Sequence, residues 1–202
     1  MSRYRIPKQR VRVEVRVSNS RFIATLAPAS TMKAAQDFLR EIRAEMPDAT
    51  HHVYAFKIGY GASVSEGMSD DGEPSGTSGP PALAVLRGAD IGDVALVITR
   101  YFGGTKLGTG GLVAAYTHAA QAALTKTETE EKVTRLRFEA SIPYPLYQSA
   151  RRLLDECDAR VEHEDFAADV RVRYLVPDDC AAELADRLTT LSSGHIIPKK
   201  ME

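Results

Sequence analysis

Three absences narrow the classes to which this 202-residue chain could belong. Its only cysteines, Cys157 and Cys180, are far apart in sequence, so neither a disulfide framework nor a zinc site is predicted, and a reducing cytoplasm is the expected location. No apolar run approaches the roughly 18 residues that a membrane span requires. The N-terminus also lacks the apolar core of a signal peptide. We therefore expect a cytoplasmic protein with no membrane partner.

A strong net charge is also missing, since the formal total is −1. Its distribution is nevertheless uneven. Residues 1–21 hold seven Arg and Lys against one Glu, a net of +6, whereas residues 125–202 hold twelve basic and sixteen acidic side chains, a net of −4. An anionic partner would therefore meet the first half of the chain. The alternative is a basic terminus followed by the solvent face of a strand.

Periodicity in the first half predicts an αβ domain over residues 1–126. Val11, Val13, Val15 and Val17 alternate with polar residues, which is typical of a half-buried strand. Ser30 is the expected N-cap of the first helix. The expected elements are strands at 11–17, 21–27, 51–59 and 93–99, and helices at about 30–46 and 109–124.

A polar segment at 125–132 has no apolar periodicity and is the expected boundary between two domains. After it, apolar spacing predicts strand 134–141, a helix from about Pro145, strands 160–166 and 168–176, a helix from Pro177, and a last short strand within 195–200. This β-α-β-β-α-β order over residues 133–202 is the ferredoxin-like arrangement. The chain is therefore predicted to be an α+β protein of two domains.

The segment Ser69–Pro74 places three carboxylates, those of Asp70, Asp71 and Glu73, within four residues. Such a loop could bind a hard cation such as magnesium, or supply a general acid or base. It could equally cap turns and accept backbone N–H bonds. The calcium-loop pattern is absent, and we expect neither a metal site nor a cofactor.

A glycine-rich segment from Arg100 to Gly111 has the character of an anion site. A strand ends there, glycines expose backbone N–H groups, and a helix begins at about Thr109, where its dipole favours negative charge. Neither the Walker nor the dinucleotide spacing is present. The candidate anion-binding or nucleic-acid-binding residues are Arg100, Gly103, Gly104, Lys106, Gly108, Gly110 and Gly111. Alternatively, the glycines serve tight packing, and Arg100 or Lys106 pairs with the acidic loop.

Histidine and nucleophile patterns add little. His51 and His52 are adjacent on a predicted strand, so they point to opposite faces and at most one, for which His51 is the candidate, can join the two loops. There is no Gly-x-Ser-x-Gly motif to support Ser-His-Asp catalysis. No catalytic residue is therefore assigned.

Four ordered motifs across residues 20–116 are nevertheless specific. They are Ser20-Arg21-Phe22-Ile23-Ala24, Ala49-Thr50-His51-His52, Ser69-Asp70-Asp71-Gly72-Glu73-Pro74-Ser75-Gly76-Thr77, and Arg100-Tyr101-Phe102-Gly103-Gly104-x-Lys106-Leu107-Gly108-x-Gly110-Gly111-Leu112. In these the chain closely resembles the YigZ/IMPACT family, in its bacterial branch. The resemblance implies an N-terminal domain similar to domain 2 of ribosomal protein S5 and a C-terminal ferredoxin-like domain similar to one of elongation factor G.

The resemblance also implies a link to translation, because eukaryotic members act in a stress pathway that controls it. Two positions depart from the family pattern. Pro80 follows Thr77-Ser78-Gly79 where a basic residue is common, and Ala114 replaces a common arginine. An anion site here would therefore depend more heavily on Arg100, Lys106 and helix-terminal N–H groups.

Three functional hypotheses follow. The first is a monomeric translation-associated regulator that binds structured RNA or the ribosome through the Gly-rich loop, together with a protein partner of a translation-control pathway. The low net charge and the lack of an RNP-type aromatic motif argue against it. The second is an enzyme acting on a phosphorylated or nucleotide-like small molecule, which requires the two loops to meet in one cleft. The third is an interaction module in which both loops are structural.

Overall fold

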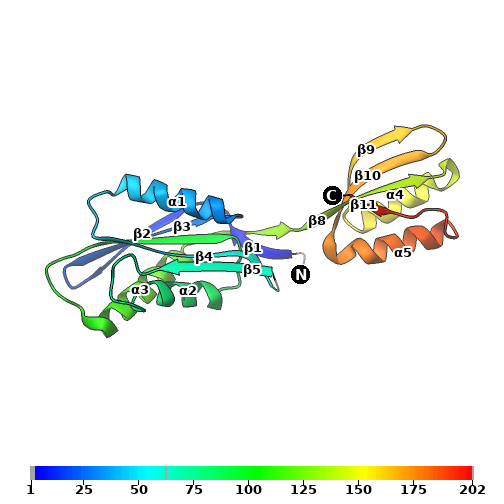
Figure 1. Cartoon of the computed structure of the whole chain (residues 1–202). Helices are drawn as coiled ribbons and strands as arrows, with labels where there is room; N and C mark the ends of the chain where they lie inside the picture. The colour runs from blue at the N-terminus through cyan, green and yellow to red at the C-terminus, as the bar shows by residue number, and fades with distance from the viewer. Residues whose placement is uncertain (1–2, 62, 202) are drawn as a thin grey trace. The chain divides into compact units, whose positions relative to one another are not determined.

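The computed structural model describes residues 3–61 and 63–201. The chain forms two compact units, one from Tyr4 to Glu131 and a second that holds the described residues of 1–3 and 132–202 (Figure 1). Both units combine helices with antiparallel sheet. The predicted α+β class with two domains is confirmed. Among the described residues, no helix is both long and apolar enough to cross a bilayer.

A five-stranded antiparallel sheet forms the centre of the N-terminal unit. Its strands, in spatial order, are β2 (Val11–Val17), β3 (Ser20–Pro28), β6 (Val94–Tyr101), β4 (His51–Tyr60) and β5 (Ser63–Ser69). Strands β3 and β6 are buried along nearly their whole length, because helices cover both faces of the sheet. The alternating valines of β2 pack on the apolar cluster on one side of the sheet, which explains the half-buried pattern of this strand.

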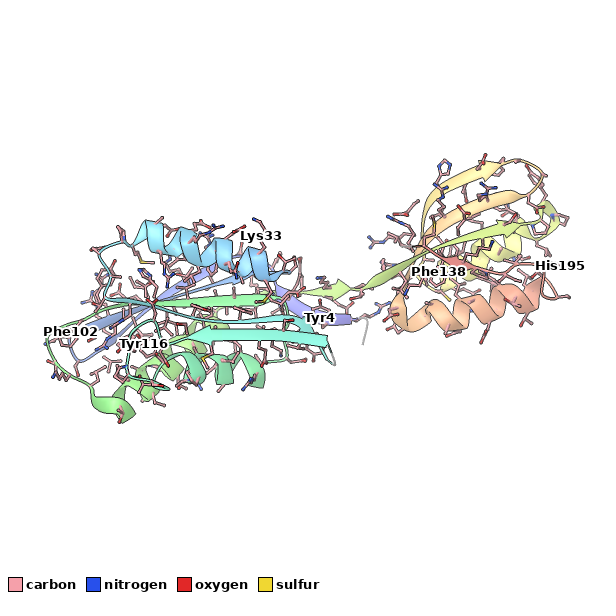
Figure 2. The ribbon with its side chains drawn as sticks, viewed as in Figure 1. Tyr4, Lys33, Phe102, Tyr116, Phe138 and His195 are labelled. Atoms are coloured by element: carbon pink, nitrogen blue, oxygen red, sulfur yellow. The ribbon has the colours of Figure 1, made fainter. Side chains whose placement is uncertain are left out.

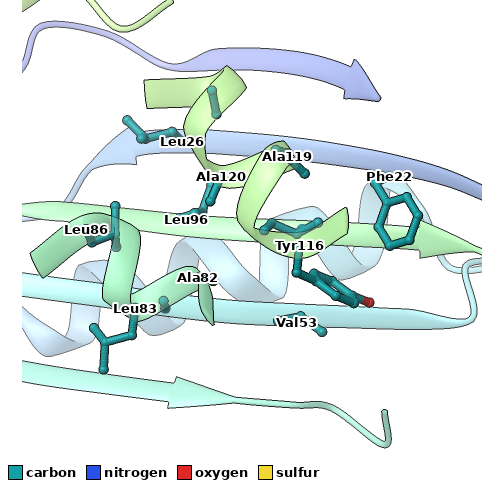
Figure 3. Close-up of a cluster of buried hydrophobic side chains, with 14 of the residues drawn as sticks. Phe22, Leu26, Val53, Ala82, Leu83, Leu86, Leu96, Tyr116, Ala119 and Ala120 are labelled. Carbon is teal, nitrogen blue, oxygen red and sulfur yellow. The ribbon is translucent and has the colours of Figure 1, made fainter. Parts of the chain in front are cut away.

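Helices pack on both faces of this sheet. Helix α1 (Met32–Glu45) covers one face, where Phe38 and Ile42 are buried, and α2 (Gly79–Gly88) and α3 (Gly108–Thr125) cover the other (Figure 1). On the α2–α3 face, side chains of both helices pack against β3, β4 and β6 (Figure 3). The unit thus has two apolar layers, one on each side of the five-stranded sheet.

Several elements differ from the sequence-based expectation. Thr31, and not Ser30, caps α1, because the Thr31 hydroxyl accepts the N–H of Ala34 at 3.0 Å. Helix α2 was not predicted, since it begins inside a Gly/Pro-rich stretch; proline is tolerated in the first helical turn, where its missing N–H has no partner to lose. Strand β5 was also missed. The polar segment 125–132 contains the start of β7 (Thr129–Val133), which pairs with β1 (Arg3–Pro7).

The C-terminal unit has the predicted β-α-β-β-α-β order. Its elements are β8 (Arg135–Ile142), the short 3-10 helix η1 (Tyr144–Leu146), α4 (Tyr147–Glu156), β9 (Arg160–Phe166), β10 (Val170–Pro177), the 3-10 helix η2 (Asp178–Cys180), α5 (Ala181–Leu191) and β11 (Lys199–Lys200). The sheet order β11-β8-β10-β9 is ferredoxin-like. Leu154 of α4 and Leu188 of α5 are fully buried in its core. The last strand is shorter than the expected 195–200 segment.

Candidate functional site

The candidate site lies at one end of the N-terminal sheet. Phe22 of β3 and His51 of β4 are each paired with Arg100 of β6, so the three side chains form a row across the sheet on one face. Helix α3 covers this face, and its Tyr116 packs edge-on against Phe22 with ring centroids 5.1 Å apart. Both loops singled out in the sequence leave the sheet near this row. Figure 2 labels Phe102 and Tyr116 at this end of the unit.

Asp70 shapes the acidic loop and the start of α2. Its carboxylate accepts the backbone N–H groups of Gly76 at 2.8 Å, Ser78 at 3.0 Å and Gly79 at 2.8 Å, and the Ser78 hydroxyl at 2.7 Å. Burial opposes ionisation of this carboxyl, but these hydrogen bonds outweigh it, so the pKa of Asp70 is lower than usual. Asp70 therefore has the structural role considered for it.

Asp71 joins the acidic loop to the neighbouring elements. Its φ of 46° lies in the left-handed region, which Asp tolerates better than most residues. The carboxylate accepts from Arg43 at 2.5 Å and from the backbone N–H of His52 at 2.6 Å. Its carbonyl oxygen lies 2.8 Å from Nδ1 of His51. These contacts fix the loop against α1 and β4.

Glu73 is different, because its carboxylate is buried among side chains. Its side chain is 3% exposed, and its Oε1 accepts from Nη1 of Arg100 at 2.7 Å and from the hydroxyl of Tyr116 at 2.7 Å. Burial, and then the hydrogen bond to Glu73, raises the pKa of Tyr116 far above its usual value. Tyr116 thus remains a hydrogen-bond donor to Glu73 at any physiological pH.

Arg100 is paired with the acidic loop, the alternative considered for it in the sequence. Besides bonding Glu73, its Nη2 donates to the Ser20 hydroxyl at 3.3 Å. The guanidinium carbon lies 5.3 Å from the Phe22 ring centroid and 5.5 Å from that of Phe102. Its buried Nε has no hydrogen-bond partner among the described residues. The charge of Arg100 is therefore compensated by Glu73, and its side chain is 6% exposed.

The two loops meet in one cavity of about 360 Å³. Its walls are formed by Glu73, Pro74, Arg100, Phe102, Lys106, Leu107, Gly108, Thr109 and Leu112. Lys106 is exposed, and within the described ranges no carboxylate lies at ion-pair distance from it. The first-turn N–H groups of any helix lack partners within the helix, and at the start of α3, at Gly108, no side-chain cap in the described part of the chain accepts from them. Lys106 and these N–H groups are the uncompensated positive features of the cavity.

The candidate glycines fall into distinct roles. A Cβ on Gly103 would lie 2.0 Å from the backbone carbonyl carbon and oxygen of Asn19, so Gly103 serves close packing. Gly104 and Gly108 have φ values of 82° and 71°, which favour glycine. A Cβ on Gly110 would meet nothing within 4 Å. Of these four, Gly110 is the glycine for which local structure gives no packing or backbone requirement.

Two contributors to the site were missed in the sequence reasoning. Ser20 and Tyr116 each bind the Glu73–Arg100 pair, one from β3 and one from α3. A signal existed for Tyr116, because a tyrosine in an otherwise Ala-rich buried helix face needs a partner for its hydroxyl. Which residue supplies that partner is a long-range feature, since Glu73 lies 43 positions away.

The basic N-terminal segment is partly neutralised by ion pairs. Arg10 and Arg12 bind the carboxylates of Glu41 and Glu45 at 2.7 and 2.5 Å, and Arg16 and Arg21 bind Glu14 at 2.8 and 2.9 Å. These arginines therefore present less unpaired charge than a net of +6 indicates. Among the residues that the structure describes, no group of three or more His, Cys, Asp or Glu is arranged to hold a metal ion.

The Impact N-terminal domain family matches residues 18–124, a segment that contains the whole cavity. The chain belongs to the IMPACT family. A second match, to a domain of unknown function called DUF1949, covers residues 141–195. IMPACT family member YigZ of Escherichia coli K12 is 37% identical over 97% of each chain. IMPACT family member YvyE of Bacillus subtilis is 32% identical over 90% of this chain and 83% of its own.

A solved structure has the same architecture. A crystal structure described as that of a hypothetical protein aligns with a TM-score of 0.73 and 37% identity, covering 100% of this chain and 98% of the other. The predicted membership of the YigZ/IMPACT family is therefore confirmed.

The two glycines Gly103 and Gly110 should respond oppositely to alanine. Gly103→Ala should lower the free energy of unfolding by about 1–3 kcal/mol, because the new methyl group collides with the Asn19 backbone. Gly110→Ala should leave it unchanged or raise it by up to about 1 kcal/mol, because helix entropy improves and the space is open. Urea unfolding measures both, and equal destabilisation would refute these roles.

Stabilisation by Asp70 should depend on pH. Its pKa is lowered in the folded state, so the stabilisation is present above the unfolded-state pKa of about 4 and is lost as pH falls through the folded value. Asp70→Asn should therefore destabilise the protein at pH 7 by about 1 kcal/mol, and by less at pH 3. Thermal unfolding across this range measures the difference. Asp155→Asn is the control, because Asp155 is exposed and its carboxylate accepts no hydrogen bond from any described residue, so the unfolding free energy at pH 7 should be nearly unchanged.

Removing the Tyr116 hydroxyl should lower the free energy of unfolding. Tyr116→Phe deletes a buried hydrogen bond to a carboxylate and should cost about 1.5–3 kcal/mol of unfolding free energy. Tyr174→Phe is the control, because Tyr174 is 1% exposed as a whole residue and its hydroxyl makes no hydrogen bond to any described residue. Similar losses in both variants, measured by chemical denaturation, would contradict a specific role for the Tyr116–Glu73 bond.

Proposed function

We propose that this IMPACT family member binds a nucleotide in the cavity beneath its Gly-rich loop, with the phosphate at Lys106 and the first turn of α3. The observation that carries the proposal is that one cavity joins Lys106 to the N-terminus of α3, and among the described residues Lys106 has no ion-pair partner and the helix has no side-chain cap. Backbone N–H groups and the helix dipole both favour an anion there. A phosphate fits this charge, and its second contact would come from the Lys106 ammonium.

The remaining walls suit a flat, largely apolar group. Pro74, Phe102, Leu107 and Leu112 line the cavity, and Phe102 is 46% exposed, which leaves ring surface for stacking. A cavity of about 360 Å³ lies within the range of small-ligand sites. Phosphate and base together therefore account for both the charged and the apolar parts of the cavity.

A free nucleotide, or a similar phosphorylated molecule, is the ligand that the geometry favours. One cavity is lined by Glu73 of the acidic loop and by Arg100 and Lys106 of the Gly-rich loop. The small-molecule hypothesis required the two loops to meet in this way. Four arginines of the N-terminal segment, which supported a broader RNA surface, are engaged by Glu14, Glu41 and Glu45. The same proposal includes a reaction of the bound molecule in which Glu73 acts as the base.

RNA is the second candidate source of the nucleotide. The exposed ring of Phe102 next to Lys106 favours it, because unpaired RNA bases stack on aromatic side chains while cations hold the backbone. In this version the protein is a cytoplasmic translation-associated factor that contacts the ribosome, in line with what the family resemblance implies. A protein partner in translation control belongs to this version as well.

Replacing Lys106 should show whether nucleotide binding depends on this site or on surface charge in general. Lys106→Ala should weaken binding of GMP or AMP about tenfold, because a phosphate contact is lost. Lys33→Ala is the control, since Lys33 is an exposed cation on α1, which covers the opposite sheet face (Figure 2). Isothermal titration calorimetry measures both. Equal weakening by the two variants, or no binding by the wild type, would refute the proposed phosphate site.

A parallel binding experiment with RNA decides whether the ligand is a free nucleotide or RNA. Single-stranded RNA oligomers and ribosomes would be tested at low and near-physiological salt. Binding of RNA or ribosomes that survives at near-physiological salt and is lost in Lys106→Ala supports the RNA version. Tight mononucleotide binding with no RNA or ribosome association supports the small-molecule version.

A further inference from the structure

The C-terminal unit has a cavity of its own, of about 370 Å³, on the open face of its sheet. Helices α4 and α5 pack on the other face, where Ala140 and Ile142 of β8 are buried with them. Since side chains alternate along a strand, Glu139 and Ser141 of β8 point away from this core. The cavity is lined by Glu139, Ser141, Arg171, His195, Ile197 and Lys199. Its walls therefore come from β8, β10, β11 and the segment that leads into β11.

Strand pairing places two cations of this cavity on either side of β8. Lys199 of β11 is paired with Glu139 of β8. On the other side, Arg171 of β10 is paired with Ser141 of the same strand. Directly paired residues carry their side chains on one face of a sheet. Arg171 and Lys199 thus project from the same open face and border one cavity.

The carboxylate in the lining, that of Glu139, is already paired. It accepts from Nε of Arg173 at 2.8 Å. This hydrogen bond, together with the positive charges of Arg171 and Lys199, lowers the pKa of Glu139, so the carboxylate stays ionised and bound to Arg173. Arg171 and Lys199 themselves make no ion pair with any described residue. They therefore contribute two positive charges to the cavity that Glu139 does not neutralise.

Two further carboxylates lie near the cavity without lining it. Asp169 accepts the hydroxyl of Ser141 at 3.2 Å. Asp165 of β9 is paired with Arg171 across the strands, but not at ion-pair distance. Both aspartates are exposed, and water screens the attraction between exposed charges that are not in contact. Arg171 and Lys199 are therefore available to bind an anion directly.

We propose that this cavity binds a phosphate monoester, at a site independent of the one in the N-terminal unit. The two cations match the charge of such a group, which is about −1.5 to −2 at pH 7. The planar fork of Arg171 suits two phosphate oxygens, and the Lys199 ammonium suits a third. Ile197 lines the same cavity and is 66% exposed, so its side chain can contact the apolar part of the ester.

NMR titration of the isotope-labelled full chain with phenyl phosphate tests this proposal. We expect saturable shifts of the amide signals of Ser141, Arg171 and Lys199, which distinguish this site from the cavity of the N-terminal unit. Benzenesulfonate has the same ring but a single negative charge, so it should bind about tenfold more weakly. An absence of saturable shifts at these three residues, or equal affinity for the two probes, would overturn the proposal and leave the proposed nucleotide site unaffected.

Substitution of the two cations provides the second measurement. The double variant Arg171→Gln/Lys199→Gln should weaken phenyl phosphate binding at least tenfold, and both positions are exposed, so the fold should be retained. Arg152→Gln is the control, because Arg152 is an exposed cation of α4 that makes no ion pair with any described residue. Unchanged affinity in the double variant, or equal weakening in the control, would exclude the proposed contacts.

Single-stranded RNA is the competing ligand for a pair of cations on an open sheet face. Its backbone phosphates are diesters with one charge each, so an oligomer without a terminal phosphate should bind this site more weakly than phenyl phosphate. Tighter binding of that oligomer, with shifts at the same three amides and loss in the double variant, would overturn the assignment to a phosphate monoester.

Discussion

The buried ion pair between Glu73 and Arg100 is the interaction on which the N-terminal unit's site depends. Both side chains are nearly inaccessible to water, at 3% and 6% exposure, so each charge requires the other. Removing one partner of such a pair leaves an uncompensated buried charge, which costs about 3–5 kcal/mol. The pair also joins four segments. Arg100 lies on β6 and Glu73 on the acidic loop, while Ser20 of β3 accepts from Arg100 and Tyr116 of α3 donates to Glu73. The position of the cavity follows from this arrangement.

The same pair redistributes the roles of the charged residues. Arg100 is one of the two cations of the Gly-rich motif, yet in the structure its charge is compensated by Glu73. The positive character of the cavity thus comes from Lys106 and the start of α3, at its rim. The carboxylates divide in the same way: Asp70 and Asp71 hold the loop, whereas Glu73 alone lines the cavity. Ligand contacts are therefore expected from few side chains.

Local patterns in the sequence predicted most of the fold. The alternating valines of β2, the apolar face of α1 and the β-α-β-β-α-β order of the C-terminal unit all reflect short-range periodicity, and all are present. Helix α2 was missed because its glycine and prolines are typical of loops. The Glu73–Arg100 pair was considered only as an alternative, because its members lie 27 residues apart and periodicity does not report which distant charges meet.

A crystal structure of the protein soaked with GMP tests the central claim most directly, namely that this cavity holds a phosphate at the start of α3. The account predicts electron density for phosphate within hydrogen-bond distance of the first-turn N–H groups and Lys106, with the base against Phe102. Density for the nucleotide elsewhere, with the cavity empty at saturating ligand, would contradict it.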